Sequence, residues 1–597
     1  MQILLASAYF CLNLCLRRGE GVDDCEMNES TTTLAAENVL RLNLGWLDYV
    51  LVAIYFVFVL GIGFIARSQI STSLDFFLSG RRLPAWVTGL AFISANLGAI
   101  EIMGMAANGA EVGLSTMHYY WIGAVPAMLF LGVVMMPFYY GSKVRSVPEF
   151  MRRRFGPGAH LVNAISFALA QVLIAGVNLF LLATVINALL GWPRWLSLIV
   201  AAVVVLSYIT LGGLSAAIYN EVLQFFVILA ALIPLTVFGL IRVGGWNGLK
   251  DKVIDTLSDG KVTASTHDQL TTWPGQALSG FDSPVWSVIG IVFGLGFVLS
   301  FGYWTTNFVE VQRAMASNSM SAARRSPIIA TFPKMFIPFV IIVPGMIAAA
   351  AIGDMIRLKS TGKGDITYND AMLLMIRDIL PNGLLGVAVA GLMASFMAGM
   401  AANISAFNTV FSYDIWQDYV VKDRPDGYYI AVGRVATVAA AILAIFTALI
   451  AAGYSNLMDY LQTLFGFFNA PLFATFILGM FWKRMTSTAG WVGLVSGTLS
   501  AVFVFVLGEA GVLNLPGQGV PFIAASAAFV VDIIVSVAVT MVTTPKPVAE
   551  LAGLVYSETP REVFQDPDGA GKAWYYRPVP LASVALALTV ILNIVFH

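Results

Sequence analysis

The chain has 597 residues, of which 58% are hydrophobic and only 11% are charged. Because soluble domains usually carry about 25% charged residues, this composition indicates an integral membrane protein. The net charge of −1 excludes a basic nucleic-acid-binding surface, and three cysteines are too few for a disulfide framework. The apolar runs are long enough for membrane helices rather than barrel strands, so we expect an all-α fold.

The N-terminal segment 1–44 precedes the first long apolar run. Its first 16 residues are apolar, but they are short for a span and lack the positive charges that open a signal peptide. We therefore expect residues 1–44 to be a polar leader, with the working protein beginning near Met27.

About fourteen apolar runs follow, each near or above the 20 residues that a helix needs to cross a bilayer. They cover 45–66, 83–108, 118–140, 159–190, 193–212, 216–242, 284–308, 326–352, 383–416, 428–452, 456–482, 486–509, 520–543 and 577–597. Arginine and lysine concentrate in alternate short loops, which stay on the cytoplasmic side of a membrane. This pattern predicts a multi-pass protein of the plasma (inner) membrane with both termini outside.

The second run contains a polar interruption at 91–105, "AFISANLGAIEIMGM". Asn96, Gly98 and Glu101 stand where a lipid-facing helix would carry Leu or Val. Within a bilayer, a break in the backbone is tolerated only where protein or a watery cavity satisfies the freed peptide groups. The segment therefore predicts an unwound helix beside an internal cavity.

A similar interruption occurs at 299–307, "LSFGYWTTN", with Ser300, Gly302 and Asn307 at membrane depth. Each interruption opens a group of five apolar runs, the first from 83 to 242 and the second from 284 to 482. Paired breaks at corresponding positions of two halves indicate the central site of a transporter. The alternative is two unrelated kinks in a large helical bundle.

Three ionisable residues lie within predicted spans: Glu101, Lys334 and Glu221. Each costs roughly 2.5–3.5 kcal/mol at mid-membrane, so such residues often mark a substrate or ion pathway. Glu101 and Lys334 could instead form an ion pair that only holds helices together. Glu221 lies about one turn into its run and could instead be solvated near the inner surface. No Walker loop occurs, so ATP hydrolysis is not indicated and uphill transport would need an ion gradient.

Several motifs together resemble the sodium/solute symporter family, with the sugar-transporting branch nearest. They are "FFLSGRRLPAWVTGLAFISAN" (76–96), "SVPEFMRRRFG" (146–156), "GGLSAAIYNEVLQ" (212–224), "NFVEVQR" (307–313), "FNTVFSYDIWQDY" (407–419) and "GMFWKR" (479–484). The resemblance implies two inverted five-helix repeats, at 83–242 and 284–482, whose first and sixth core helices are discontinuous. It also implies one peripheral helix at 45–66 and three at 486–597.

The resemblance also implies a substrate site. Asn96, Lys334 and Gln462 stand at positions matching polar residues that line the family's sugar site, and Tyr303 matches the aromatic residue that covers the sugar from the inner side. Three matching positions carry a different residue here: Glu101 for a glutamine, Tyr120 for a glutamate and Ser300 for an asparagine. The expected substrate is a small polar solute, a sugar or a polyol.

The implied sodium site differs more. Family members hold Na⁺ with backbone carbonyls, here at Ser94 and Leu97, and with two adjacent serines, here replaced by Ala398 and Gly399. Ser395 is the remaining hydroxyl at a matching position. Glu221 matches an aspartate that is tied to a further cation site in some members, which makes it a candidate for ion coupling.

Two coupling ions therefore remain open. Na⁺ could bind a rebuilt site of Ser395, carbonyls and water. Alternatively, the carboxylates of Glu101 and Glu221 could couple transport to protons, because a desolvated carboxylate binds a proton nearer to neutral pH.

We expect an ion-coupled symporter that imports its solute by alternating access; it is not expected to be an enzyme or to need an organic cofactor. A non-transporting solute sensor and an uncoupled uniporter or channel are the alternatives. Oligomeric state is not indicated.

Overall fold

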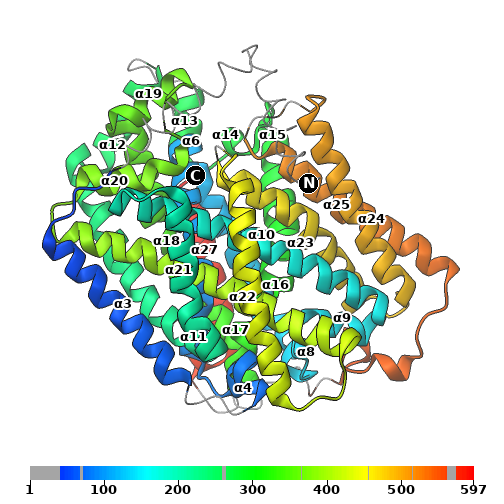
Figure 1. Cartoon of the computed structure of the whole chain (residues 1–597). Helices are drawn as coiled ribbons and strands as arrows, with labels where there is room; N and C mark the ends of the chain where they lie inside the picture. The colour runs from blue at the N-terminus through cyan, green and yellow to red at the C-terminus, as the bar shows by residue number, and fades with distance from the viewer. Residues whose placement is uncertain are drawn as a thin grey trace, which may run out of the picture.

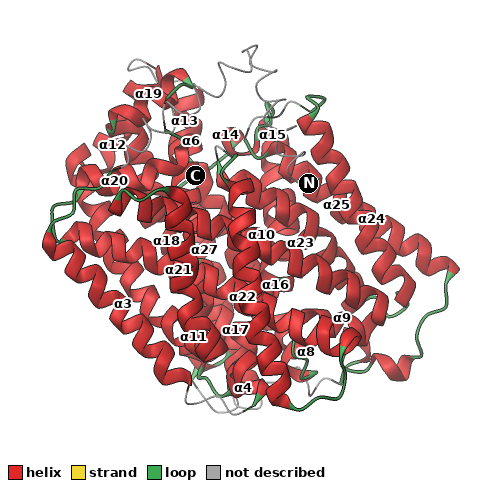
Figure 2. Cartoon of the chain, viewed as in Figure 1, coloured by secondary structure: helices red, strands yellow, loops and turns green. Residues whose placement is uncertain are grey.

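The computed structural model describes residues 41–67, 72–258, 264–364, 366–454, 456–513, 515, 517–560, 562 and 573–597. This described part consists of helices and loops (Figure 2), and its one β contact is an isolated bridge between Leu83 and Ser317. An all-α membrane fold was expected. Most of the expected leader, residues 1–40, lies outside the described residues.

Ten long helices form most of the part of the chain that the structure describes (Figure 1): α3 (Trp46–Arg67), α10 (Pro157–Leu190), α11 (Arg194–Val243), α18 (Met320–Ala351), α21 (Leu384–Thr409), α22 (Asp426–Ala451), α23 (Leu457–Phe481), α24 (Ser487–Glu509), α25 (Gly519–Val542) and α27 (Pro578–Val595). Shorter helices complete the chain: α4 (Ser73–Leu78), α5 (Ala85–Asn96), α6 (Met105–Val112), α7 (Val125–Phe130), α8 (Met136–Gly141), α9 (Val147–Phe155), α12 (Gly245–Ser258), α13 (Ala264–Leu270), α14 (Gln276–Ser279), α15 (Pro284–Ile289), α16 (Phe301–Thr306), α17 (Phe308–Met315), α19 (Gly353–Thr361) and α20 (Ala371–Ile379). π-Helical segments extend several of them, at Ile100–Gly104, Tyr119–Ala124, Leu131–Met135, Gly290–Ser300 and Val410–Val420.

Twelve helices of the described part are long and apolar enough to cross a membrane, or thirteen when one bent pair counts as a span. The expected number was about fourteen. The difference lies at 193–212: this run forms the first part of α11, and only its stretch Arg194–Ser207 enters the count of apolar helices. It continues into the span Gly213–Val243 through Gly213, whose φ of 54° kinks α11 at the predicted "GGLSA" turn.

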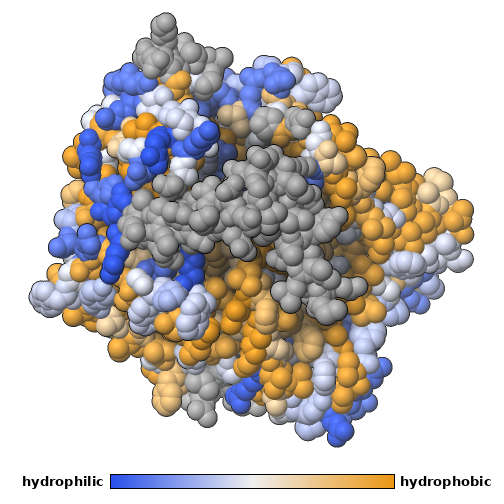
Figure 3. Space-filling model, turned by 45° about the horizontal axis from the view of Figure 1, so that its top comes forward, coloured by the Kyte–Doolittle hydropathy of each residue, from blue (hydrophilic) through white to orange (hydrophobic). Residues whose placement is uncertain are grey.

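The positions of the short helices and the distribution of hydrophobic side chains distinguish two ends of the molecule. In Figure 1, α4, α8 and α9 lie at the bottom and α12, α13 and α19 at the top; we call these the lower and upper ends. In Figure 3, hydrophobic side chains dominate the right side of the face and the region below the grey atoms, and hydrophilic ones gather toward its upper left and lower edge. Such an apolar surface between polar regions suits a protein that crosses a bilayer.

The first predicted break is present. Helix α5 ends at Asn96, and Leu97 leaves the helical conformation with φ −74° and ψ 44°. The axis of Ala85–Asn96 meets that of Ile100–Met117 at 58°. Gly98 suits this bend because a Cβ atom there would lie 3.0 Å from Asn178 Oδ1 and 3.2 Å from the Cα of Gly399.

The second predicted break is present as well, at the end of the "LSFGYWTTN" segment. Helix α16 stops at Thr306, and Asn307 is extended with φ −70° and ψ 114°. The side chain of Asn307 accepts a hydrogen bond from the amide of Val309 and so caps α17. Asparagine is a strong N-cap residue, which explains why a new helix starts at this point.

Helix α18 crosses the core and carries four prolines within its length, Pro327, Pro333, Pro338 and Pro344. A proline has no amide hydrogen, so each removes one hydrogen bond from the helix. One freed carbonyl has a replacement donor: Thr236 Oγ1 of α11 lies 3.5 Å from the oxygen of Val340. Lys334 lies in the middle of this proline-rich stretch.

Candidate substrate site

A central cavity of ≈ 90 Å³ lies between the two helix breaks. Since about 10–15 Å³ of such space holds one water, the cavity can take several waters or a small polar solute. All seven residues expected at the substrate site line it: Asn96, Glu101, Tyr120, Ser300, Tyr303, Lys334 and Gln462. They come from both breaks and from the helices beside them, so residues over 350 positions apart in sequence meet around one hollow.

Lys334 is the central cation of this cavity. Its Nζ donates a hydrogen bond to Glu101 Oε1 at 2.5 Å and another to Asn96 Oδ1. The same ammonium lies 4.5 Å from the ring centroid of Tyr120 and 5.2 Å from that of Trp304, within cation–π range. The expected ion pair between Glu101 and Lys334 therefore exists, and it forms part of the cavity wall rather than a remote contact.

Tyr303 lines the cavity and connects the first helix break to α17. Its hydroxyl accepts a hydrogen bond from Asn96 Nδ2 at 3.0 Å and donates one to Glu310 Oε1 at 2.8 Å. Its ring packs on Phe465, with centroids 4.6 Å apart. The tyrosine is thus held by one helix break and by α17, which begins after the other.

The remaining expected residues line the cavity more loosely. The hydroxyl of Tyr120 is buried beside Glu101 and makes no hydrogen bond of ordinary geometry among the described residues. Ser300 and Gln462 are also buried, at 8% and 3% exposure. Gly123 leaves room for Ser300, because a Cβ at 123 would lie 2.4 Å from the serine oxygen.

The expected cation-binding residues meet at the first break. Ser395 Oγ donates a hydrogen bond to the carbonyl oxygen of Leu97 at 2.6 Å, and Ser94 Oγ is buried without a partner in the described part of the chain. Sequence analysis missed Asn178 of α10, whose Oδ1 accepts from the amide of Ala99 at 3.1 Å. The sequence feature that indicates Asn178 is a side-chain amide within the long apolar run 159–190.

These oxygens suit a hard cation in type but are few in number. Hard cations such as Ca²⁺ take about six to eight oxygen ligands. Ala398 and Gly399 add no side-chain oxygen, and Gly399 leaves no space for one. A Cβ there would lie 2.8 Å from Asn178 Oδ1 and 2.9 Å from the Cα of Gly98.

Glu221 is buried in the protein and is not solvated near the inner surface. It is 0% exposed, and Arg313 of α17 donates to both of its carboxylate oxygens, at 2.6 and 3.3 Å. The solvated interpretation is therefore wrong, because the side chain is fully buried and paired with Arg313 of α17. Glu221 does not line the central cavity.

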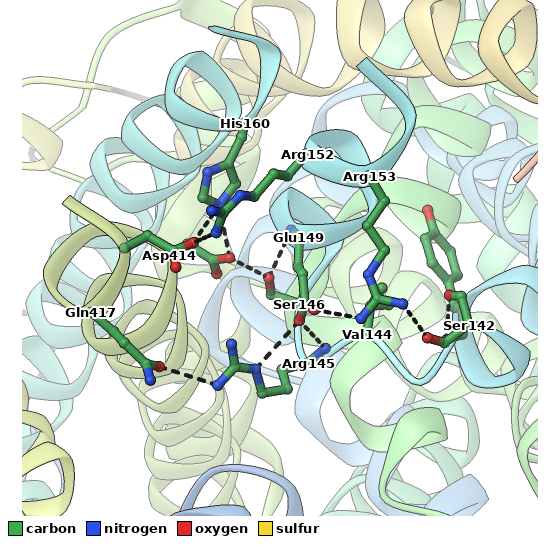
Figure 4. A network of polar contacts seen from close by, with 12 residues as sticks. Ser142, Val144, Arg145, Ser146, Glu149, Arg152, Arg153, His160, Asp414 and Gln417 are labelled. Atoms are coloured by element: carbon green, nitrogen blue, oxygen red, sulfur yellow. Dashed lines mark hydrogen bonds and ion pairs between the residues drawn. The ribbon is translucent and has the colours of Figure 1, made fainter. Parts of the chain in front are cut away.

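A further polar cluster at the lower end joins α9 and α10 to the segment Val410–Val420 (Figure 4). Asp414 accepts a hydrogen bond from Ser146 Oγ at 2.8 Å and lies 3.0 Å from Nε2 of His160. Next to it, Arg152 pairs with Asp418. The cluster connects α9 and α10, which follow the first break, to a segment that follows the second.

Glu149 of α9 anchors the arginines of this cluster (Figure 4). Burial raises the pKa of Glu149, but hydrogen bonds from the Arg145 amide and from the guanidinium groups of Arg145 and Arg153 more than offset it. Its pKa therefore lies below the usual range, and the carboxylate is charged at neutral pH.

Two discontinuous helices around a polar cavity, inside a bundle with an apolar girdle, define a secondary transporter rather than an enzyme. The chain belongs to the sodium:solute symporter family, whose family model matches residues 76–497.

Two relatives agree with this family assignment, and a solved structure agrees with the fold. The chain is 27% identical over 482 residues to a sodium/glucose cotransporter of Vibrio parahaemolyticus, covering 77% of this chain and 85% of the relative. It is 28% identical over 485 residues to sodium/myo-inositol cotransporter 2 of Mus musculus, covering 77% of this chain and 70% of the relative. The structure of a Na⁺-coupled sialic acid symporter in its substrate-bound outward-open state matches with a TM-score of 0.68 at 18% identity, covering 84% of this chain and 99% of that chain.

Proposed function

We propose that this protein is a Na⁺-coupled symporter that imports a small polar solute, a sugar or a polyol, by alternating access. The observation that carries the proposal is the convergence of seven polar or aromatic side chains on one cavity between two broken helices. Cotransporters of glucose and of myo-inositol among the relatives support a polyhydroxy solute. A unit charge moving through 100 mV supplies about 2.3 kcal/mol, enough for roughly fifty-fold accumulation.

The proposed solute contacts follow from the donors and acceptors that face the cavity. The ammonium of Lys334 and the amide of Gln462 can bind hydroxyl oxygens of the solute, and the carboxylate of Glu101 can accept hydrogen bonds from hydroxyl groups. Tyr120 and Ser300 add hydroxyls, and Asn96 links the solute to Tyr303. Tyr303 is the proposed inner gate, since its hydroxyl joins Asn96 in the cavity wall to Glu310 behind it.

The proposed coupling ion binds at the first break as cargo. Ser94, the carbonyl of Leu97 and Ser395 are its candidate ligands, and Asn178 adds an amide oxygen beside them. Water would complete the shell, because Ala398 and Gly399 contribute no oxygen. Glu221 is not proposed as a direct ligand, since Arg313 engages both of its carboxylate oxygens.

We further propose that 83–242 and 284–482 are the two inverted repeats, with 45–66 and 486–597 as peripheral helices. The upper end would face the outside and the lower end the cytoplasm, because the arginines of α9 gather at the lower end. The carboxyl end of α27 lies toward the upper end (Figure 1), which agrees with an external C-terminus.

The test is uptake of labelled glucose and labelled myo-inositol by proteoliposomes, with a Na⁺ gradient or a H⁺ gradient imposed separately. We expect Na⁺-driven accumulation of at least one solute, and Gln462→Ala should weaken it with a matched loss in solute binding. Binding without any uptake would show a sensor. Equal final levels with and without the Na⁺ gradient would show a uniporter or channel.

A further inference from the structure

Five side chains form a continuous polar chain from the cavity toward the lower end. Glu101 contacts Lys334, Lys334 contacts Asn96, Asn96 contacts Tyr303, and Tyr303 donates to Glu310. The first four residues line the cavity, but Glu310 lies behind the tyrosine, in the first turn of α17. The chain thus ends at a carboxylate that the proposed solute and sodium contacts do not use.

Glu310 differs from the other two buried glutamates near the site. Glu101 is paired with Lys334 and Glu221 with Arg313, and both contacts are ion pairs. Glu310 is 0% exposed, its Oε1 has only the hydroxyl of Tyr303, and its Oε2 is buried with no hydrogen-bond partner in the described part of the chain.

The cations nearest to Glu310 are committed elsewhere. Arg313, on the same helix, donates to Glu221, to the carbonyl of Val309, to Gln312 and to Ser405. Lys334 of α18 donates to Glu101 and Asn96. The charged and titratable groups acting on Glu310 are therefore Tyr303 in contact and Arg313, Lys334 and Glu221 at longer range.

An ionised carboxylate in this position has one hydrogen bond and the N-terminal end of α17 to stabilise it. A buried charge without a cation partner is costly, and a carboxyl group can remove the charge by binding a proton. We propose that Glu310 is a proton-binding site that controls the Tyr303 gate. This inference rests on the proposed function for the identity of the gate.

Protonation changes the strength of the contact that holds the gate. A hydrogen bond to an ionised carboxylate is about twice as strong as one to a neutral acceptor. When a proton binds Glu310, Tyr303 is held less firmly between Asn96 and α17, and the cavity opens more readily toward the lower end. Acid pH therefore accelerates solute exchange. Loss of the proton restores the stronger hydrogen bond between Tyr303 and Glu310 and keeps the gate closed.

The test is the pH dependence of Na⁺-driven uptake of labelled glucose and labelled myo-inositol by proteoliposomes, with equal pH on both sides. For wild type we expect a single-proton transition, with rates about tenfold higher on the acid limb, as the difference between charged and neutral hydrogen bonds implies. Glu310→Gln should give a flat profile at the acid-limb rate, since glutamine cannot ionise.

Tyr303→Phe supplies an independent arm that leaves the carboxylate in place. This variant removes the hydroxyl that donates to Glu310, so the pH profile of its normalised uptake rate should also be flat. The double variant should show the same flat profile as each single variant. Asp532→Asn is the matched control: Asp532 is 0% exposed, its partners are the hydroxyls of Thr475 and Ser536, and it lies outside the cavity lining. It should keep the wild-type profile.

A wild-type profile in Glu310→Gln, or in Tyr303→Phe if the first variant does not fold, would overturn the proposal. A flat profile in Asp532→Asn would also overturn it, because the titration would then not belong to Glu310. Solute exchange at equilibrium, measured without any gradient, separates the two proposals. If Na⁺ drives no accumulation but exchange keeps the Glu310-dependent profile, sodium coupling fails and the proton site stands.

Discussion

Lys334 and Glu101 form an ion pair, with Nζ and Oε1 2.5 Å apart, in the wall of the central cavity. The side chain of Lys334 is 2% exposed and that of Glu101 is 10% exposed. The pair therefore stabilises the contact between α18 and the first helix break, and it also offers charged groups to a solute.

The two contributions can be separated by paired substitutions. Removing one partner of a buried ion pair leaves the other unpaired, which costs about 3–5 kcal/mol. We expect Lys334→Gln and Glu101→Gln each to lower the thermal midpoint in detergent, and the double variant to recover much of the loss. Uptake should remain low in the double variant. If uptake recovers together with stability, the pair is purely structural.

Gly399 should tolerate no side chain. In Gly399→Ala the new methyl would press on Asn178 Oδ1 and on the backbone of Gly98, and overpacking of this kind costs about 1–3 kcal/mol. We expect lower stability and a higher Na⁺ concentration for half-maximal uptake, because the first break must shift. Gly427→Ala is the control, since nothing lies within 4 Å of a Cβ at that position. Equal behaviour of the two variants would contradict the close packing.

Lys359 should make the docking of α19 depend on pH. Its Nζ donates to the carbonyl of Ala110 at 2.5 Å and to Gln269 at 2.6 Å. Burial lowers the pKa of Lys359 to about 8, although nearby Glu111 opposes the shift. A released lysine has a pKa of about 10.4, so the released state binds more protons between these values. Docking should therefore strengthen as pH rises from about 8 toward about 10.

Hydrogen exchange of the α19 amides, corrected for intrinsic rates, measures this docking. We expect slower corrected exchange as the pH rises through that window, and no such trend in Lys359→Gln. A trend of the opposite sign would show that the ammonium form is the one that docks.

Asp414 should contribute more to stability than its neighbour Asp418. Asp414→Ala leaves Ser146 and His160 without their common partner in a buried place, which we expect to cost about 3 kcal/mol. Asp418→Ala removes a pair whose arginine, Arg152, is 46% exposed, and such pairs contribute about 0–1 kcal/mol. Thermal unfolding of both variants gives the comparison, and equal losses would contradict the central place of Asp414.

Sequence reasoning located the first helix break well, because polar residues interrupt an apolar run there. Asn96, Gly98 and Glu101 are conspicuous among hydrophobic neighbours, and a polar group at membrane depth has few environments open to it. The same argument would have found Asn178, since it also lies within a long apolar run. The position of Tyr303 followed from the family resemblance and not from its chemistry.

Glu310 and Glu221 were harder to interpret for a physical reason. Both lie near the predicted end of an apolar run, where a charged side chain commonly reaches water. Their burial comes from packing between α11, α17 and their neighbours, which are far apart in sequence. The count of about fourteen spans is not confirmed, and it differs at 193–212, where the apolar run joins the next one in a single helix, α11, that is kinked at Gly213.

The four prolines of α18 have a mechanical consequence. A helix that lacks several backbone hydrogen bonds bends more easily, and the bending concentrates at the prolines. Lys334 lies between Pro333 and Pro338, so its ammonium can move with a bound solute through small displacements while the surrounding helices stay in place. A stiffer α18 would restrict the movement of the Lys334 ammonium and slow the transport cycle, although every contact to the solute would be kept.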